Sequence, residues 1–290
     1  MYVKRLIGIS AVIVVGVGAT YFHSMQSMHH GNPDRVSNAS SALSQSNSGS
    51  GKDDPGSIQD KRPTEWLATS VLTSSVKSQL HTTNIIYNGF GSFVVNDNQN
   101  NLNVNVKSQP YVQLSQLDSK GRPQAANALL AQSSREYRNR QDTGNSKTID
   151  PVGWHQKVLY KGKVLYNRGH SIGYALAGSI KGFDASEANP LNITTQTSWA
   201  NQASNGNDEN TGQNYYETLV RKALDKNKSV RVRYRVTPIY TNNNLVPSGT
   251  HMEAKSNDGS VQFNVFVPNV QPGMIIDYAT GMPKSGSIVI

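Results

Sequence analysis

Four consecutive residues, Asn167-Arg168-Gly169-His170, combine side chains that can do acid–base and phosphate chemistry. The imidazole of His170 can accept a proton near neutral pH, which makes it a candidate general base. The planar guanidinium of Arg168 can meet a phosphate, and a structural ion pair is the equal alternative. Two other histidines, His155 and His251, have no such neighbours and are expected to be structural. Four common residues are by themselves a weak signal.

A second group of polar residues follows this string. The segment from Asn192 to Asn201 is rich in amides, and Asn201 stands 31 residues after His170. Glu217 follows, one turn into the helix expected next. The chain has no cysteine, which excludes disulfides, thiol nucleophiles and Cys-ligated zinc. A metal ion would therefore bind His, Asn, Asp or Glu, whose oxygen donors suit Mg²⁺, Mn²⁺ or Ca²⁺.

These blocks, in this order and at this spacing, resemble the DNA/RNA non-specific endonucleases, whose ββα-metal site carries an Asp-Arg-Gly-His signature. The resemblance is closer to bacterial membrane-anchored DNA-entry (competence) nucleases and streptodornase-like DNases, and it covers roughly residues 80–285. It depends on three blocks, Tyr166–Leu176, Asn192–Asn201 and Gly212–Glu217. It implies an α+β fold, a ββα-metal nuclease core with a central antiparallel sheet flanked by helices.

The resemblance gives each of these residues a role in phosphodiester hydrolysis. His170 would be the general base, and Asn201 would bind a single Mg²⁺ directly, with Mn²⁺ or Ca²⁺ as alternatives. Asn192 would contact phosphate or water, or position its neighbours, and Glu217 would hold waters of the metal ion. Glu217 could instead pair with Arg221 four residues later. Asn192 and Asn201 could instead be turn or cap residues.

One position departs from the family pattern. The first signature residue is usually Asp, and this chain has Asn167 there. An amide can accept a hydrogen bond but brings no negative charge to orient or polarise its neighbours. We therefore expect this difference to affect the catalytic rate more than the mechanism.

The charge of the chain favours polyanionic partners. The formal net charge is +9, and most of it lies beyond residue 62, because the first 62 residues hold six basic against four acidic side chains. The densest basic stretch could follow a nucleic-acid backbone or form a solvated strand face. It consists of Arg221, Lys222, Lys226, Lys228, Arg231, Arg233 and Arg235.

Two functions are consistent with these features. The first is a Mg²⁺-dependent endonuclease that hydrolyses DNA, and RNA as well, without strong sequence specificity, because it contacts the phosphate backbone. The alternative is a basic surface protein that binds nucleic acid with weak catalysis or none.

The amino terminus has the order of a secretory signal. Lys4 and Arg5 precede an uncharged apolar run over residues 6–22. A signal anchor in the membrane is the favoured interpretation, a cleaved signal peptide is the alternative, and both place the remainder outside the membrane. We assign residues 1–23 to this signal, 24–62 to a disordered Ser/Gly/Asn-rich linker and 63–290 to the nuclease domain. The expected location is the extracellular face of the membrane or the medium.

Helices and strands must position these side chains. Apolar residues recur at helical spacing over residues 65–80 and, most clearly, over 212–227 with Thr211 as its candidate cap. Residues 124–132 are rich in Ala and Leu and are also expected to be helical. Short strands are expected at residues 85–87 and 93–95, and a hairpin over 156–166 with its turn at 161–163. Alternation predicts a strand over residues 229–240 and a last strand over 261–267.

Overall fold

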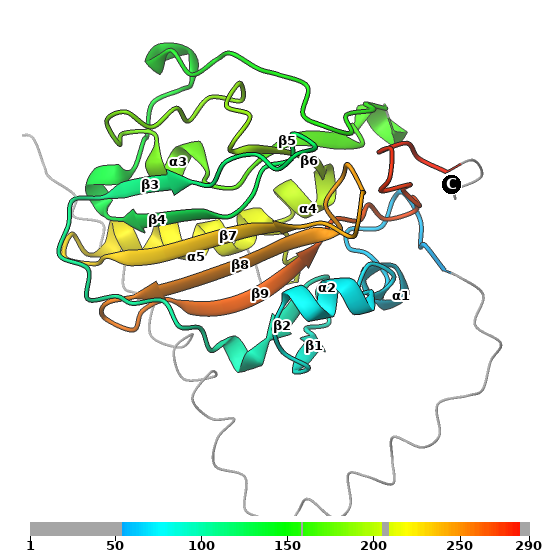
Figure 1. Ribbon diagram of the computed structural model, residues 1–290, viewed down its shortest axis with the longest axis horizontal. Coiled ribbons are helices and arrows are strands. Elements are labelled where there is room, and N and C mark those ends of the chain that lie inside the picture. Colours follow the sequence, from blue (N-terminus) through cyan, green and yellow to red (C-terminus); the bar gives the residue numbers. More distant parts are fainter. Residues whose placement is uncertain (1–53, 158, 205–208, 285–290) are drawn as a thin grey trace, which may run out of the picture. The chain divides into compact units, whose positions relative to one another are not determined.

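The computed structural model describes residues 54–157, 159–204 and 209–284. Its centre is a seven-stranded sheet in which neighbouring strands are antiparallel (Figure 1). In order across the sheet, the strands are β1 (Ile85–Tyr87), β2 (Phe93–Val95), β9 (Gln262–Pro268), β8 (Gly249–Ser256), β7 (Val232–Ile239), β4 (Ala126–Leu130) and β3 (Tyr111–Leu114).

A separate two-stranded ribbon carries the His170 string. β5 (Tyr166–His170) pairs antiparallel with β6 (Ile193–Thr197), so that His170 lies opposite Ile193. Helix α3 (Tyr174–Ala177) lies between these two strands along the chain, and α4 (Ser198–Gln202) and α5 (Gln213–Lys226) follow β6. The predicted α+β fold with a central antiparallel sheet is confirmed.

Helix α5 lies along one face of the large sheet (Figure 1). Its apolar stripe, Tyr216, Val220 and Leu224, is buried in the same core as the inward side chains of β7, β8 and β9. The ring of Tyr216 lies 5.1 Å from that of Phe263 on β9. Burial of this stripe fixes the rotation of α5 about its axis, and it thereby fixes the direction of the neighbouring Glu217.

The other face of β7 carries the arginines of the basic stretch. Val232, Tyr234 and Val236 are buried on the α5 side, so Arg231, Arg233 and Arg235 point away from it. Each donates to the segment of residues 96–110: Arg231 to the carbonyl of Ser108 (2.6 Å), Arg233 to that of Asn103 (3.2 Å), and Arg235 to Oδ1 of Asn101 (3.2 Å). Arg235 also pairs with Glu253. These arginines hold that segment on the sheet, so a freely solvated face does not describe them. They remain partly exposed, and contact with a nucleic-acid backbone stays a prediction.

The helix predicted over residues 65–80 is two helices. α1 (Glu65–Thr69) begins at Thr64, whose side chain accepts from the N–H of Leu67, and α2 (Ser74–Gln79) begins at Thr73 in the same way. Each threonine satisfies an N–H that has no partner within its helix. The second cap starts a new helix where a continuous one was expected.

The helix predicted over residues 124–132 is wrong, because its central residues form β4, which pairs with β7 on one side and the edge strand β3 on the other. The helix over 212–227 is confirmed as α5, although its N-cap is Gly212 and not Thr211. The hairpin over 156–166 is reduced to a turn, η6 (Tyr160–Gly162), with main-chain bonds on either side of it. The remaining 3₁₀ turns are η3 (Asn96–Asn98), η4 (Gln132–Ser134) and η5 (Gln141–Thr143).

The folded part begins before Pro63, where the composition placed its start. Ile58 is 3% exposed, and the main-chain N–H of Gly273 donates to the carbonyl of Pro55 at 2.8 Å. Residues 54–62 therefore pack on the domain. The signal predicted over residues 6–22 lies outside the described residues, as does the linker up to residue 53. Among the residues that are described, no helix is long and apolar enough to cross a membrane.

Candidate active site

His170 ends β5 in a buried position, with 9% of its surface exposed. Its Nε2 lies 3.2 Å from a guanidinium nitrogen of Arg140. A guanidinium can only donate, so Nε2 is the acceptor and the proton of the neutral ring is on Nδ1. The imidazole also hydrogen-bonds to the main chain of Ala185. Burial, followed by the charge of Arg140, lowers the pKa of His170 to about 3. The ring is therefore neutral at ordinary pH.

Glu217 is held on both of its carboxylate oxygens. Oε1 accepts from Nε2 of Gln213 at 2.9 Å, and Oε2 accepts from Arg221 at 3.3 Å. Burial raises the pKa of Glu217, while Gln213 and the nearby arginines oppose that shift. A Cβ on Gly173 would lie only 3.0 Å from Oε2 of Glu217, so this glycine lets the turn after β5 approach the carboxylate closely.

Gln213 connects His170 to Glu217. Its Nε2 donates to the carbonyl of His170 as well as to Glu217, and its Oε1 accepts from Nε2 of Gln196 at 3.0 Å. Gln213 is 2% exposed and Gln196 is 1% exposed. These buried amides connect β5, β6 and α5 beside His170. Both glutamines lie inside or beside the recognised blocks, but nothing in their spacing distinguished them.

Asn192 is fully buried and clamps the loop after His170. Its Oδ1 accepts from the N–H of Ile172 at 2.9 Å, and its Nδ2 donates to the carbonyl of the same residue at 3.0 Å. Both ends of its amide are thus occupied by main chain. Of the roles expected for Asn192, this geometry favours that of a positioner over contact with phosphate or water.

Asn201 lies on α4 and lines a cavity of about 260 Å³ together with Arg168 and Glu187. Its side-chain amide makes no hydrogen bond with any of the residues that the structure describes. Arg168 is engaged instead: it donates to Asp150 at 2.7 Å and lies over the ring of Trp154 at 4.7 Å. The geometry thus favours the structural alternative for Arg168.

Arg140 contacts both His170 and a residue of the cavity that Asn201 lines. Its part in the site was not predicted from the sequence. It contacts His170 as described, its Nε lies 4.0 Å from Glu187 on the cavity, and its guanidinium stacks over Tyr174 at 4.5 Å. Burial lowers the pKa of Arg140. It lies 30 residues before His170 in a loop with several arginines. No local pattern marks it, because only the fold brings that loop against β5.

The donors available for a metal ion are few. No group of three or more His, Asp or Glu side chains able to hold a metal occurs in the described part of the chain. The amide oxygen of Asn201 on its cavity, with water completing the coordination, is compatible with a hard cation that keeps much of its water shell. His251 is unrelated to this site: it lies on β8 and bonds Asn264 at 2.6 Å, as expected of a structural residue.

Known proteins match the chain in both sequence and fold. The family model for DNA/RNA non-specific endonucleases matches residues 91–285. NucA from Streptococcus agalactiae with magnesium bound is 44% identical over 75% of this chain and 99% of that chain, with a TM-score of 0.66. The structure of NucA with no metal bound is 44% identical over 74% and 99%, with a TM-score of 0.64. The Sda1 nuclease with bound zinc is 22% identical over 61% and 80%, with a TM-score of 0.50, which is a likeness of fold alone.

Proposed function

The chain belongs to the DNA/RNA non-specific endonuclease family, and we propose that it hydrolyses phosphodiester bonds of DNA and RNA with a divalent metal ion and without strong sequence specificity. A phosphodiester resists attack because its charge repels nucleophiles. Hydrolysis therefore needs an activated water and positive charge where negative charge accumulates. The observation that carries the proposal is the buried, neutral imidazole of His170 with Nε2 against the guanidinium of Arg140.

In this proposal His170 takes the proton of the attacking water at Nε2. The bond to the main chain of Ala185 keeps the tautomer that leaves Nε2 unprotonated. Arg140 occupies Nε2 in the structure, but a phosphate would offer it a stronger, charge-assisted acceptor. Binding of the substrate would thus move Arg140 onto the phosphate and leave Nε2 to the water.

We assign the metal to Asn201, with Mg²⁺ as the ion and Mn²⁺ or Ca²⁺ as alternatives. The support is the amide of Asn201, which has no partner among the described residues and lies on a cavity, and the magnesium bound in NucA. When bound, the ion would supply positive charge beside the phosphate. Glu217 keeps lone pairs beyond the two in use, so it can accept hydrogen bonds from waters. Arg168 and Asn192 act by positioning.

The proposed location is the extracellular face of the membrane or the medium. This depends on the order of charge and apolar residues over residues 4–22 alone.

The test uses the full chain, purified in detergent, with plasmid DNA and with RNA in the presence of Mg²⁺. We expect cleavage of both, abolished by EDTA and reduced about 10²–10⁴-fold by His170→Ala, which is the usual contribution of a general base. His155→Ala removes an exposed imidazole and is the matched control. Binding without cleavage by the wild-type protein would instead establish the alternative, a basic nucleic-acid-binding surface protein.

A further inference from the structure

A second cavity, of about 480 Å³, adjoins the one that Asn201 lines. The two share Val164, Asn167 and Gln202. Helix α4 contributes to both, because Asn201 lines the first and Ser198 lines the second. We call the two cavities together the α4 groove.

The far end of the α4 groove is built by the N-terminal segment. Lys61 lines it, and the carbonyl of Lys61 accepts from Nδ2 of Asn210 at 2.8 Å. Oδ1 of the same Asn210 accepts from the indole N–H of Trp199 at 2.7 Å. Trp199 and Asn210 are each 5% exposed. This buried bridge fixes the backbone of Lys61 to the helix that carries Asn201.

The α4 groove offers two unpaired ammonium groups. Lys61 and Lys163 are exposed, and neither side chain has a hydrogen bond or ion pair with any residue in the described ranges. The acidic residues of the groove are already engaged. Asp60 accepts from a main-chain N–H at 2.7 Å, and Glu187 lies 4.0 Å from Arg140. The Asp60 carboxylate keeps its charge, so two lysines against one carboxylate without an ion pair among the described residues leave the groove with a net positive charge.

We propose that the α4 groove holds the sugar–phosphate backbone of a nucleic-acid strand as it leaves the candidate active site, with phosphates at Lys61 and Lys163. The proposal rests on the proposed function. It fits an enzyme without sequence specificity, because lysine–phosphate contacts carry no sequence information.

Asn167 lies at the junction of the two cavities, and its Nδ2 is buried with no partner among the described residues. Because this atom is buried, a strand in the groove would reach it only after a rotation of the Asn167 side chain. The aspartate that the family usually has at this position would instead place a carboxylate beside the phosphates.

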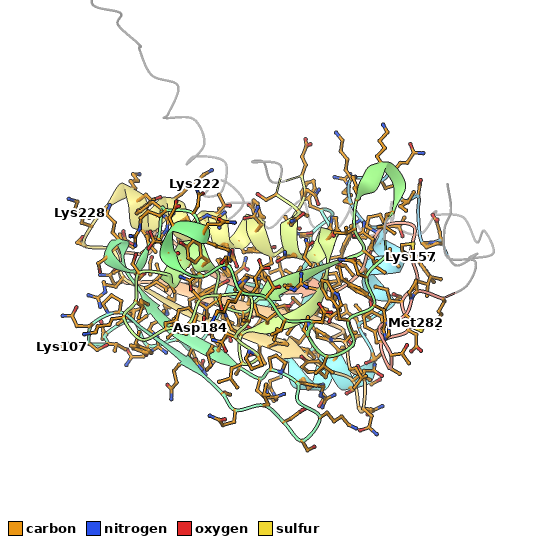
Figure 2. The ribbon with its side chains drawn as sticks, turned by 90° about the horizontal axis from the view of Figure 1, so that it is seen from above. Lys107, Lys157, Asp184, Lys222, Lys228 and Met282 are labelled. Carbon is orange, nitrogen blue, oxygen red and sulfur yellow. The ribbon has the colours of Figure 1, made fainter. Side chains whose placement is uncertain are left out.

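The experiment measures binding of labelled oligonucleotides in EDTA, so that cleavage does not interfere, to the full chain carrying His170→Ala. Adding Lys61→Ala and Lys163→Ala should weaken binding of a strand of about 20 nucleotides several-fold and reduce the salt slope by about 1 for each lysine. Binding of a dinucleotide, which cannot extend along the groove, should change less. The charge-matched control is the double variant Lys107→Ala, Lys120→Ala. Lys107 lies at the opposite end of the molecule from Lys157, which follows the cavity residue Gln156 (Figure 2).

Two results would refute binding of the strand in the α4 groove. One is equal weakening of binding by the two double variants. The other is a loss of binding on substitution of Lys61 and Lys163 that is the same for the dinucleotide and the long strand. Cleavage by the wild-type protein is assayed in parallel. A wild-type protein that fails to cut would overturn the proposed function, while the binding data would still decide the groove.

Discussion

The two halves of the candidate site differ in how their polar atoms are satisfied. Around His170, the imidazole, the Glu217 carboxylate and the Gln213 amide all have protein partners, although the buried Oε1 of the adjoining Gln196 has none among the described residues. Around Asn201, its amide and Nδ2 of Asn167 have none among the residues described. Side chains with fixed partners keep their geometry without a ligand. In the proposed mechanism, the first half is therefore preorganised for proton transfer, and the second leaves its groups for metal, water and nucleic acid.

After His170→Ala, the largest effect should come from the open half. Asn201→Ala removes the assigned metal ligand, and outer-shell losses alone cost about 10–100-fold in metal affinity. We expect the Mg²⁺ concentration for half-maximal cleavage to rise by at least about 100-fold, with thermal unfolding little changed because the amide has no partner among the described residues. A Mg²⁺ titration of the cleavage rate measures this. An unchanged midpoint would remove Asn201 from the metal site.

Gln213→Leu should break the preorganised half. It removes the amide shared by the His170 carbonyl and Glu217, and we expect kcat to fall about 10–100-fold, as for other supporting residues, with a smaller change in KM. Leaving buried partners unsatisfied should also cost about 1–3 kcal/mol of unfolding free energy. Steady-state kinetics and thermal unfolding measure the two effects. Lys222→Ala, at an exposed position on the same helix, is the control. Loss of stability with normal kcat would make the role of Gln213 structural only.

Arg140→Gln should change the pH dependence. Burial and the charge of Arg140 both lower the pKa of His170, and a general base works only when it is unprotonated. The wild-type enzyme should therefore keep its activity well below pH 6.5. Without the charge of Arg140 the pKa of His170 rises, so activity should be lost at a higher pH as the solution is made acidic. Profiles of kcat/KM against pH compare the two. If kcat/KM fell at the same acidic pH in both proteins, the contact between Arg140 and Nε2 of His170 would be contradicted.

Asn167→Asp should have the smallest effect. It tests whether the groups around Asn201 bind nucleic acid. A carboxylate at the junction of the two cavities should weaken oligonucleotide binding about 2–5-fold, the size of a solvated charge interaction, and less so at high salt. Anisotropy titrations at two salt concentrations measure it. A higher kcat with unchanged binding would instead show that the usual aspartate serves catalysis here.

Elements with a strong local period could be predicted, and those without one could not. The stripe of α5 and the alternation of β7 are set by burial of one face, so the sequence displays them. The run over 124–132 is rich in Ala and Leu, which favour helix, but its place between β3 and β7 makes it a strand. Tertiary pairing thus overrode local propensity.

The sequence by itself determined the candidate chemistry: the imidazole of His170, amides and no thiols, a positive net charge, and blocks in the order of a nuclease family. Only the tertiary structure decided which polar groups are occupied and which are free. It placed Arg140 against His170 and Gln213 between His170 and Glu217. It bonded both ends of the Asn192 amide to main chain and placed Asn201 on a cavity. The physical reason is that a hydrogen-bond partner is chosen by proximity in space. Loops and sheets bring together residues that no local spacing relates.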